Sequence, residues 1–188
     1  MTAPLDLALP GHAPGGTIVV GLDLSLTATG IAHLTPTGAV VDTIRGKGTG
    51  ITRLRALARE IRDLCTGATL VVIEGPAYHQ ASGAGYHERA GLHWMVLDRL
   101  HWAEVPSVVV STSVMKKYAT GKGSGKKGPT IDAAIRRYPE VDTAGDDNAC
   151  DALWLAALGL DHLTGIHRVP ESHRVVLSSV DWPVRGAA

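Results

Sequence analysis

The chain has 188 residues, which is enough for one domain with a sizeable core and too few for two full domains. Hydrophobic residues make up 45% of it and charged residues 19%, a composition that excludes a disordered chain, and no apolar run is long enough to span a membrane. The formal net charge is zero, but five of the six lysines fall within positions 116–127, so the neutral total hides a concentrated basic segment.

The N-terminal residues 1–16 are rich in proline, glycine and alanine and are expected to form a flexible tail. They lack the basic start and the apolar run of a signal peptide, so we expect a cytoplasmic protein. Cys65 and Cys150 fall in predicted helices with no metal-binding pattern around them. We expect two separate thiols there rather than a disulfide.

The first half of the chain predicts three strands, a helix and a fourth strand. Short apolar runs with brief connections at 17–23, 29–35 and 39–45 indicate an antiparallel meander. Residues 51–64 then repeat apolar side chains every three or four positions, which indicates a helix. The run TLVVIEGP at 69–76 is typical of a strand in the centre of a sheet.

The next predicted helix, at about 84–104, has two apolar sides. One side suits packing on the sheet and carries Leu92, Met95, Val96 and Leu100. The other side suits contact with a partner protein and carries Trp94, Leu97 and His101. The alternative is that both sides are buried within this chain.

A fifth strand is predicted at 106–111, followed by a short helix that Thr112 or Ser113 is expected to cap. A loop rich in glycine and lysine follows at 119–129. Pro129 suits the first turn of the next helix, which we expect at about 129–138.

The last predicted helix begins at Asp146 or Asp147 and is apolar on most sides, so we expect it to be buried. Together these elements predict one α/β domain over residues 17–164. Its five-stranded mixed sheet has three antiparallel strands, then two parallel strands, and helices flank it. Residues 165–188 form a C-terminal extension of unknown role, in which RVVLSSV at 174–180 is a candidate edge strand.

Two carboxylates stand at the ends of otherwise apolar predicted strands: Asp23 follows IVVGL, and Glu74 follows LVVI. Aspartate is disfavoured in strands, and a charge buried near a sheet costs free energy unless it is paired or bound to a metal. One such residue is explained by the start of a loop. Two at the ends of neighbouring strands indicate a site.

A third group of acids opens the last helix in the sequence DDNACD. Asp147 and Asp151 are four residues apart and share one helix face, whereas Asp146 points elsewhere. Asp146 and Asp147 also suit a plain capping role, because negative charge is favourable at a helix N-terminus. Four carboxylates from two strands and a helix can bind two divalent cations about 4 Å apart, and oxygen-only ligands favour Mg²⁺ or Mn²⁺. The predicted ligands are Asp23, Glu74, Asp147 and Asp151.

The lysine-rich segment is a candidate site for nucleic acid. Its glycines let the backbone approach a phosphate closely, and its lysines gain affinity through counterion release. The spacing in KGSGKKG is not that of a Walker A loop, and a merely solvated loop is the alternative. Arg55, Arg59 and Arg62 share a helix face that we interpret as solvated surface. The candidate DNA-binding lysines are Lys116, Lys117, Lys122, Lys126 and Lys127.

Five motifs in register resemble the RuvC-type Holliday-junction resolvases. They are GLDLSLTATGIA (21–32), VVIEGP, RAGLHWMVLDRL (89–100), VMKKYATGKGSGKKG and CDALWLAA, and they cover about 17–160. The resemblance implies a ribonuclease H-like fold. It also implies that Asp23, Glu74 and Asp151 match three metal-binding acids, and that Lys116 and Lys127 match basic residues that handle the scissile phosphate or the DNA backbone.

The chain departs from the family pattern at two places. The bacterial pattern places an acid or histidine three residues before the last aspartate, where this chain has Asn148. We therefore expect Asp147 to supply the fourth ligand, with Asn148 and Asp146 as alternatives. The family also has an aromatic wedge soon after the strand glutamate. It aligns with Ala77, and Tyr78 one residue later is the candidate DNA contact here.

The resemblance implies a homodimeric, magnesium-dependent endodeoxyribonuclease of DNA recombination and repair, which resolves four-way junctions. Three alternatives stay open. A relative with a broader substrate range would also cut flaps, forks or loops. A junction-binding protein without catalysis would account for Asn148 and the neutral charge. An actin-like or sugar-kinase fold also begins with a strand, an aspartate and a small-residue turn, but it needs two such domains and a second nucleotide motif.

Overall fold

The computed structural model describes residues 16–76, 85–126 and 128–183. Within them, five strands form one mixed sheet in the order β3-β2-β1-β4-β5. Strand β2 pairs antiparallel with β1 and β3, whereas β4 pairs in parallel with β1 and β5. This confirms the predicted sheet. The strands are β1 (Val19–Asp23), β2 (Thr29–Leu34), β3 (Ala39–Ile44), β4 (Leu70–Glu74) and β5 (Ser107–Val110).

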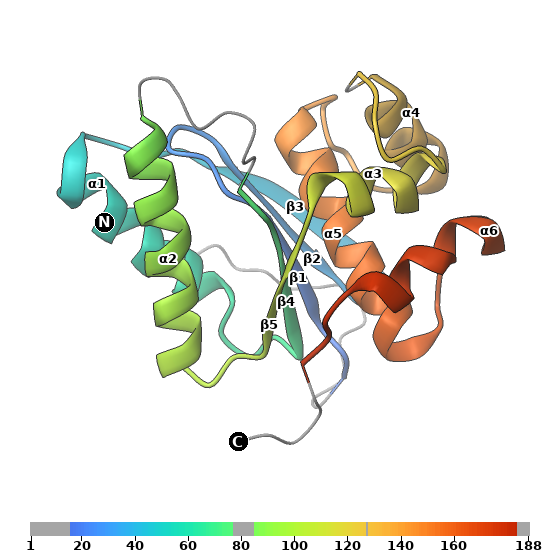
Figure 1. Cartoon of the computed structure of the whole chain (residues 1–188), viewed down its shortest axis with the longest axis horizontal. Coiled ribbons are helices and arrows are strands. Elements are labelled where there is room, and N and C mark those ends of the chain that lie inside the picture. Colours follow the sequence, from blue (N-terminus) through green and yellow to red (C-terminus); the bar gives the residue numbers. More distant parts are fainter. Residues whose placement is uncertain (1–15, 77–84, 127, 184–188) are drawn as a thin grey trace.

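Helices cover both faces of the sheet in a three-layer α/β arrangement (Figure 1). Helices α1 and α2 lie on one face, and α3, α4 and α5 lie on the other. The predicted helices differ from the observed ones only by a residue or two at their ends. The helices are α1 (Gly50–Leu64), α2 (Tyr86–Trp102), α3 (Thr112–Thr120), α4 (Gly128–Arg137) and α5 (Asp147–Thr164).

The alternation of side chains along β1 decides which of its residues lie on the face of the sheet that α5 covers. Val20 and Leu22 pack in the cluster beneath α1 and α2, whereas Val19 packs in the cluster around α5. Successive side chains of a strand point to opposite faces. Gly21 and Asp23 therefore share the α5 face of the sheet with Val19.

Two glycines let α5 lie directly on the sheet. A Cβ on Gly21 would lie 2.0 Å from the carbonyl oxygen of Ala152, and a Cβ on Gly30 would lie 2.0 Å from that of Asn148. Gly159 makes a similar close contact with side chains of β1 and β4 near the other end of the helix. Helix α5 thus runs antiparallel to β1, with its first turn at the carboxyl end of that strand.

The burial predicted for α5 is confirmed. From Ala149 to Asp161 all but Asp151 are buried, and Trp154 is completely enclosed. The indole N–H of Trp154 donates to the carbonyl oxygen of Thr130 at 3.1 Å, so its polar atom is satisfied inside the core. Each fully buried leucine of this helix contributes roughly 2 kcal/mol relative to exposure, which makes α5 the main anchor of its face.

The C-terminal segment is helical, so the edge strand proposed for 174–180 is wrong. It forms α6 (Glu171–Arg174) and a 3-10 helix, η2 (Val175–Ser179). The hydroxyls of Ser178 and Ser179 donate to carbonyl oxygens three residues earlier and stabilise these tight turns. The predicted tail lies outside the described residues apart from its last position.

Two local predictions have different outcomes. Helix α3 is capped by Ser111, whose hydroxyl accepts the backbone N–H of Val114 at 3.3 Å, and not by Thr112 or Ser113. Strand β5 ends one residue earlier than predicted, so the cap of α3 also lies one residue earlier.

Cys65 and Cys150 are both buried free thiols, as expected. Across the described ranges, no helix has the length and apolar character needed to cross a membrane.

Candidate active site

Two acidic side chains end neighbouring parallel strands on the same face of the sheet. The register of β1 and β4 leads to Asp23 and Glu74 at their adjacent carboxyl ends. Asp23 lies on the same face of the sheet as Gly21, and Glu74 lies on the same face as Val72. Gly21 and Val72 both contact α5. Both acids are half-buried. The strands therefore hold two carboxylates side by side beneath α5.

The first turn of α5 lies over these strand ends. Asp23 pairs with Gly30 on β2, and Gly30 contacts the backbone of Asn148 in α5. Asp147 and Asp151 flank that contact, are half-buried and share one helix face through their four-residue spacing. The fold thus brings the four predicted ligand residues to one edge of the sheet. Their role as metal ligands stays a prediction.

Asp146 occupies the N-cap of α5. Its Oδ1 accepts the backbone N–H groups of Asn148 at 2.8 Å and Ala149 at 3.2 Å, and its Oδ2 accepts the hydroxyl of Thr43 at 3.5 Å. This is the capping role that the sequence allowed for Asp146. The carboxylate satisfies helix N–H groups that have no partner within the helix.

The chemistry of these acids suits a hard divalent cation. They supply only carboxylate oxygens, which Mg²⁺ and Mn²⁺ prefer. Asp23, Asp147 and Asp151 each interact with a neighbouring group. Among the described residues, no three His, Cys, Asp or Glu side chains are arranged to hold a metal ion. The backbone places the residues that carry these carboxylates at one edge of the sheet.

The start of α5 carries a strongly negative local charge. Burial raises the pKa of the Cys150 thiol, and a hydrogen bond with Thr143 acts in the opposite direction. The negative charges of Asp151, Asp146 and Asp147 raise that pKa further. The same charges attract a divalent cation and repel a lone phosphate group.

The loop after α3 folds back toward the acidic edge of the sheet. Helix α3 starts at that edge, directly after β5. Gly123 lies against the start of α3, because a Cβ there would be 3.3 Å from the carbonyl oxygen of Ser113. Farther along, Lys116 Nζ donates to the carbonyl oxygen of Gly125 at 3.4 Å. We call residues 121–126 the lysine loop, and it runs back along α3 toward the acids.

The predicted DNA contacts differ in exposure. Lys116 is half-buried beneath the lysine loop, while Lys117, Lys122 and Lys126 are exposed. Lys127 and Tyr78 lie outside the described residues, as does Ala77.

Sequence reasoning did not single out a polar cluster at the far end of α5. Asp161 is buried there and bonds to Arg174 and Tyr118. A charge inside the apolar run ALGLDHL is the same kind of signal that drew attention to Asp23. Its partners come from other elements, which the local sequence does not reveal.

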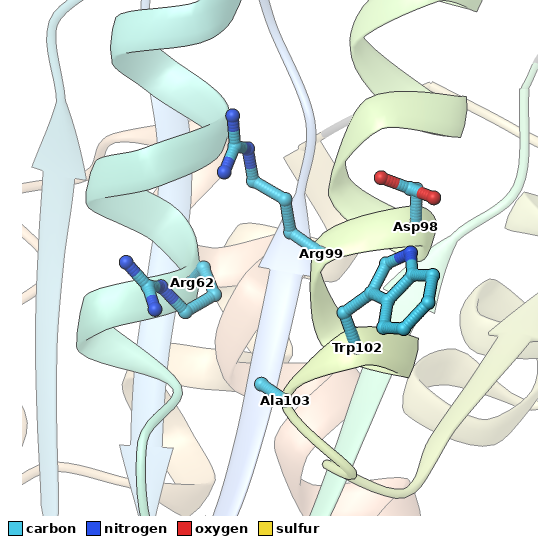
Figure 2. Close-up of a pocket in the computed structure, with 5 residues that line it drawn as sticks. All are labelled: Arg62, Asp98, Arg99, Trp102 and Ala103. Carbon is cyan, nitrogen blue, oxygen red and sulfur yellow. The ribbon is translucent and has the colours of Figure 1, made fainter.

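A pocket of about 210 Å³ lies away from the acids, between the carboxyl ends of α1 and α2. Figure 2 shows Arg62 on α1, and Arg99 reaching from α2 toward α1 beside Asp98 and Trp102. Trp102 precedes β5, so this end of α2 lies at the amino edge of that strand, whereas the acids lie at the carboxyl edge. The pocket is therefore separate from the candidate active site.

Solved structures of Holliday-junction resolvases are similar to this chain. RuvC of Thermus thermophilus gives a TM-score of 0.60 at 17% identity, covering 89% of this chain and 100% of that chain. The T. thermophilus RuvC in complex with a Holliday junction substrate gives 0.59 at 14% identity, covering 78% and 92%. The fowlpox virus Holliday junction resolvase gives 0.52 at 14% identity, covering 79% and 99%.

No protein-family model and no curated protein sequence matches the chain. At these identities the likeness to the solved structures concerns the fold. The sheet order, the helices on both of its faces and the coverage of each resolvase agree with one another. The chain therefore shares the fold of these resolvases, which is the ribonuclease H-like fold that the resemblance implied.

Proposed function

We propose that this chain is a structure-selective endodeoxyribonuclease that cuts branched DNA, above all four-way junctions. The observation that carries the proposal is a single placement. Acids from β1, β4 and α5 meet at one edge of the sheet, and the lysine loop folds back toward the same edge. Carboxylates that can hold cations beside lysines that can hold phosphates suit metal-assisted hydrolysis of a phosphodiester. The likeness to resolvases solved with Holliday junctions supports the substrate.

Four residues would hold two Mg²⁺ ions, for which Mn²⁺ would substitute: Asp23, Glu74, Asp147 and Asp151. When bound, the ions would supply an activated water and stabilise the leaving oxygen of the cut strand. Asp151 lies on a helix anchored in the core, so its position is firmly held. Asp147 is the better fourth ligand because the carboxylate of Asp146 caps the helix and Asn148 is uncharged.

The basic residues would bind the DNA backbone rather than read bases. Lys116 and Lys127 would contact the scissile phosphate, and Tyr78 would contact DNA near the branch point. Lys117, Lys122 and Lys126 would neutralise flanking phosphates, whose counterions are released on binding. Such contacts select the shape of the DNA rather than its sequence. We also propose a cytoplasmic protein whose nuclease domain spans residues 17–164.

The direct test offers labelled four-way junction, flap and duplex DNA to the purified protein with Mg²⁺, Mn²⁺ or EDTA. We expect paired nicks in the junction with either metal and none with EDTA, because the four carboxylates need a cation to act. Equal cutting of flaps and junctions would favour the broader branched-DNA nuclease. Tight junction binding without cutting under any metal would contradict catalysis.

We further propose that the enzyme is a homodimer joined through α2. Trp94 is 70% exposed and Trp102 is 80% exposed, so the alternative that both sides of this helix are buried within the chain is wrong. Leu97 is half-buried and packs against the core cluster beneath α1 and α2, whereas His101 is exposed. Large exposed aromatic side chains on one helix are typical of a protein interface. Two active sites at a fixed separation would explain a preference for four-way junctions.

The α2 interface predicts a monomer when Trp94 is replaced by glutamate, because a buried unpaired carboxylate disfavours association. Light scattering should then report half the mass of the parent protein at the same concentration. Ile135→Glu is the matched control, since Ile135 is 52% exposed on α4, on the other face of the sheet, and should leave the dimer intact. A parent protein that is monomeric at high concentration would contradict the dimer.

A further inference from the structure

A buried carboxylate ties the C-terminal segment to α3. The Asp161 side chain is fully buried in α5 and receives the Arg174 guanidinium, with Nε 2.9 Å from Oδ2 and Nη2 2.8 Å from Oδ1. The phenol of Tyr118 donates to the same Oδ2 at 3.1 Å. A buried carboxylate without such partners is strongly unfavourable, so these bonds fix α6 against α3.

His173, the residue before Arg174, lies at the start of the lysine loop. His173 Nδ1 donates to the carbonyl oxygen of Tyr118 at 2.9 Å, in the last turn of α3, where helix carbonyls lack internal donors. The other edge of the ring lies against Gly121, where a Cβ would come within 2.7 Å of Nε2. Gly121 has a φ of 80° and is the first residue of the lysine loop. His173 therefore fixes the direction in which that loop leaves the helix.

Other contacts hold the same region together. Arg137 at the end of α4 donates to the carbonyl oxygen of Ala119 at 2.9 Å, and Arg168 of the C-terminal segment donates to the carbonyl oxygen of Arg137 at 2.9 Å. At the start of the lysine loop, the Lys122 backbone N–H donates to the Thr120 hydroxyl at 3.2 Å. Both helices that flank the lysine loop are thus bonded to the C-terminal segment.

We infer that residues 165–183 position the lysine loop for DNA, with His173 as the positioning residue. This rests on the proposed DNA-binding role of the loop. A loop already held in its binding direction loses less conformational entropy when DNA arrives. Its affinity is then higher with the same number of ionic contacts. The segment of unknown role is, on this inference, a support for recognition and not for the metal-binding acids.

The inference separates affinity from salt dependence. His173→Ala should weaken junction binding roughly threefold to tenfold, the range of one hydrogen bond, while the slope of log affinity against log salt stays as in the parent. Lys122→Ala with Lys126→Ala should instead reduce that slope by about one unit per lost phosphate contact. His173→Asn should restore most of the affinity, because its side-chain amide can donate to the same carbonyl.

A measurement without DNA tests the positioning itself. Hydrogen exchange of residues 118–126 should accelerate in His173→Ala and return toward the parent rate in His173→Asn. The control is His162→Ala, which loses the stacking of His162 on Trp182, also part of the C-terminal segment. That variant should change neither exchange in the loop nor affinity.

Unchanged exchange in a folded His173→Ala variant would overturn the positioning role. The role would also be overturned if His173→Ala showed faster exchange but bound the junction as tightly as the parent, while the double lysine variant bound it weakly. If the double lysine variant also binds as the parent does, the DNA-binding role proposed for the loop is wrong. In that case the exchange rates still decide whether His173 holds the loop.

Discussion

Cleavage of a four-way junction is expected to fall by on the order of 100-fold or more when Asp23 is replaced by asparagine. Asparagine keeps the size of the side chain but removes the charge that, on the proposed mechanism, would hold a divalent cation at the end of β1. Even residues that only support a metal ligand cost about 10- to 100-fold when changed, so a direct ligand should cost at least as much. Junction affinity should stay within about twofold, because the proposed contacts with the DNA backbone are made by the lysines and not by this acid.

The measurement is a single-turnover cleavage rate at saturating junction, paired with a binding curve in Ca²⁺ or EDTA. Asp42→Asn is the matched control: Asp42 is an exposed acid on β3 whose carboxylate contacts the neighbouring backbone N–H. It should leave both quantities unchanged. Undiminished cleavage by Asp23→Asn would remove Asp23 from the mechanism.

The three acids at the start of α5 should differ in a fixed order. Asp151→Asn is expected to cost at least as much as Asp23→Asn, and Asp147→Asn should also be severe, since these two share one helix face at the edge of the sheet where the strand acids lie. Asp146→Asn should be mild, because asparagine caps a helix about as well as aspartate. The structure supports that order, since Asp146 accepts two backbone N–H groups.

Thermal unfolding separates the capping role from the catalytic one. Asp146→Ala should lower the free energy of unfolding by about 1 kcal/mol while cleavage at a permissive temperature stays close to the parent rate. Asp147→Asn and Asp151→Asn should show the opposite pattern, with cleavage lost and stability kept. A larger cleavage defect in Asp146→Asn than in Asp147→Asn would show that the ligand and the cap are exchanged.

The convergence of the acids was predictable because it depends on short-range signals. Asp23 and Glu74 each follow an apolar run, and parallel strands place such ends at the same edge of a sheet. The spacing of Asp147 and Asp151 within an apolar helix fixed their shared face. Only the closeness of α5 to the sheet needed the structure. It depends on Gly21 and Gly30, whose contacts come from distant residues.

The features that were not predictable depend on contacts between distant parts of the chain. The course of the lysine loop is set by Gly123 against Ser113 and by His173, which is 55 residues from the carbonyl it contacts. In the C-terminal segment, Arg174 bonds to the distant Asp161, a contact that the apolar residues VVL, which alone predicted a strand, do not reveal. The cap at Ser111 was missed because it depends on where β5 stops, which sequence patterns locate only to within a residue or two.

No side chain separates α5 from β1 and β2 at the two close glycine contacts, so backbone atoms alone set the spacing between the strand acids and the helix acids. We expect substitutions among the surrounding leucines and valines to change the melting temperature more than that spacing. A side chain at Gly21 or Gly30 would instead push the helix away from the strands. The arrangement of the acids is therefore most sensitive to substitution at these two glycines.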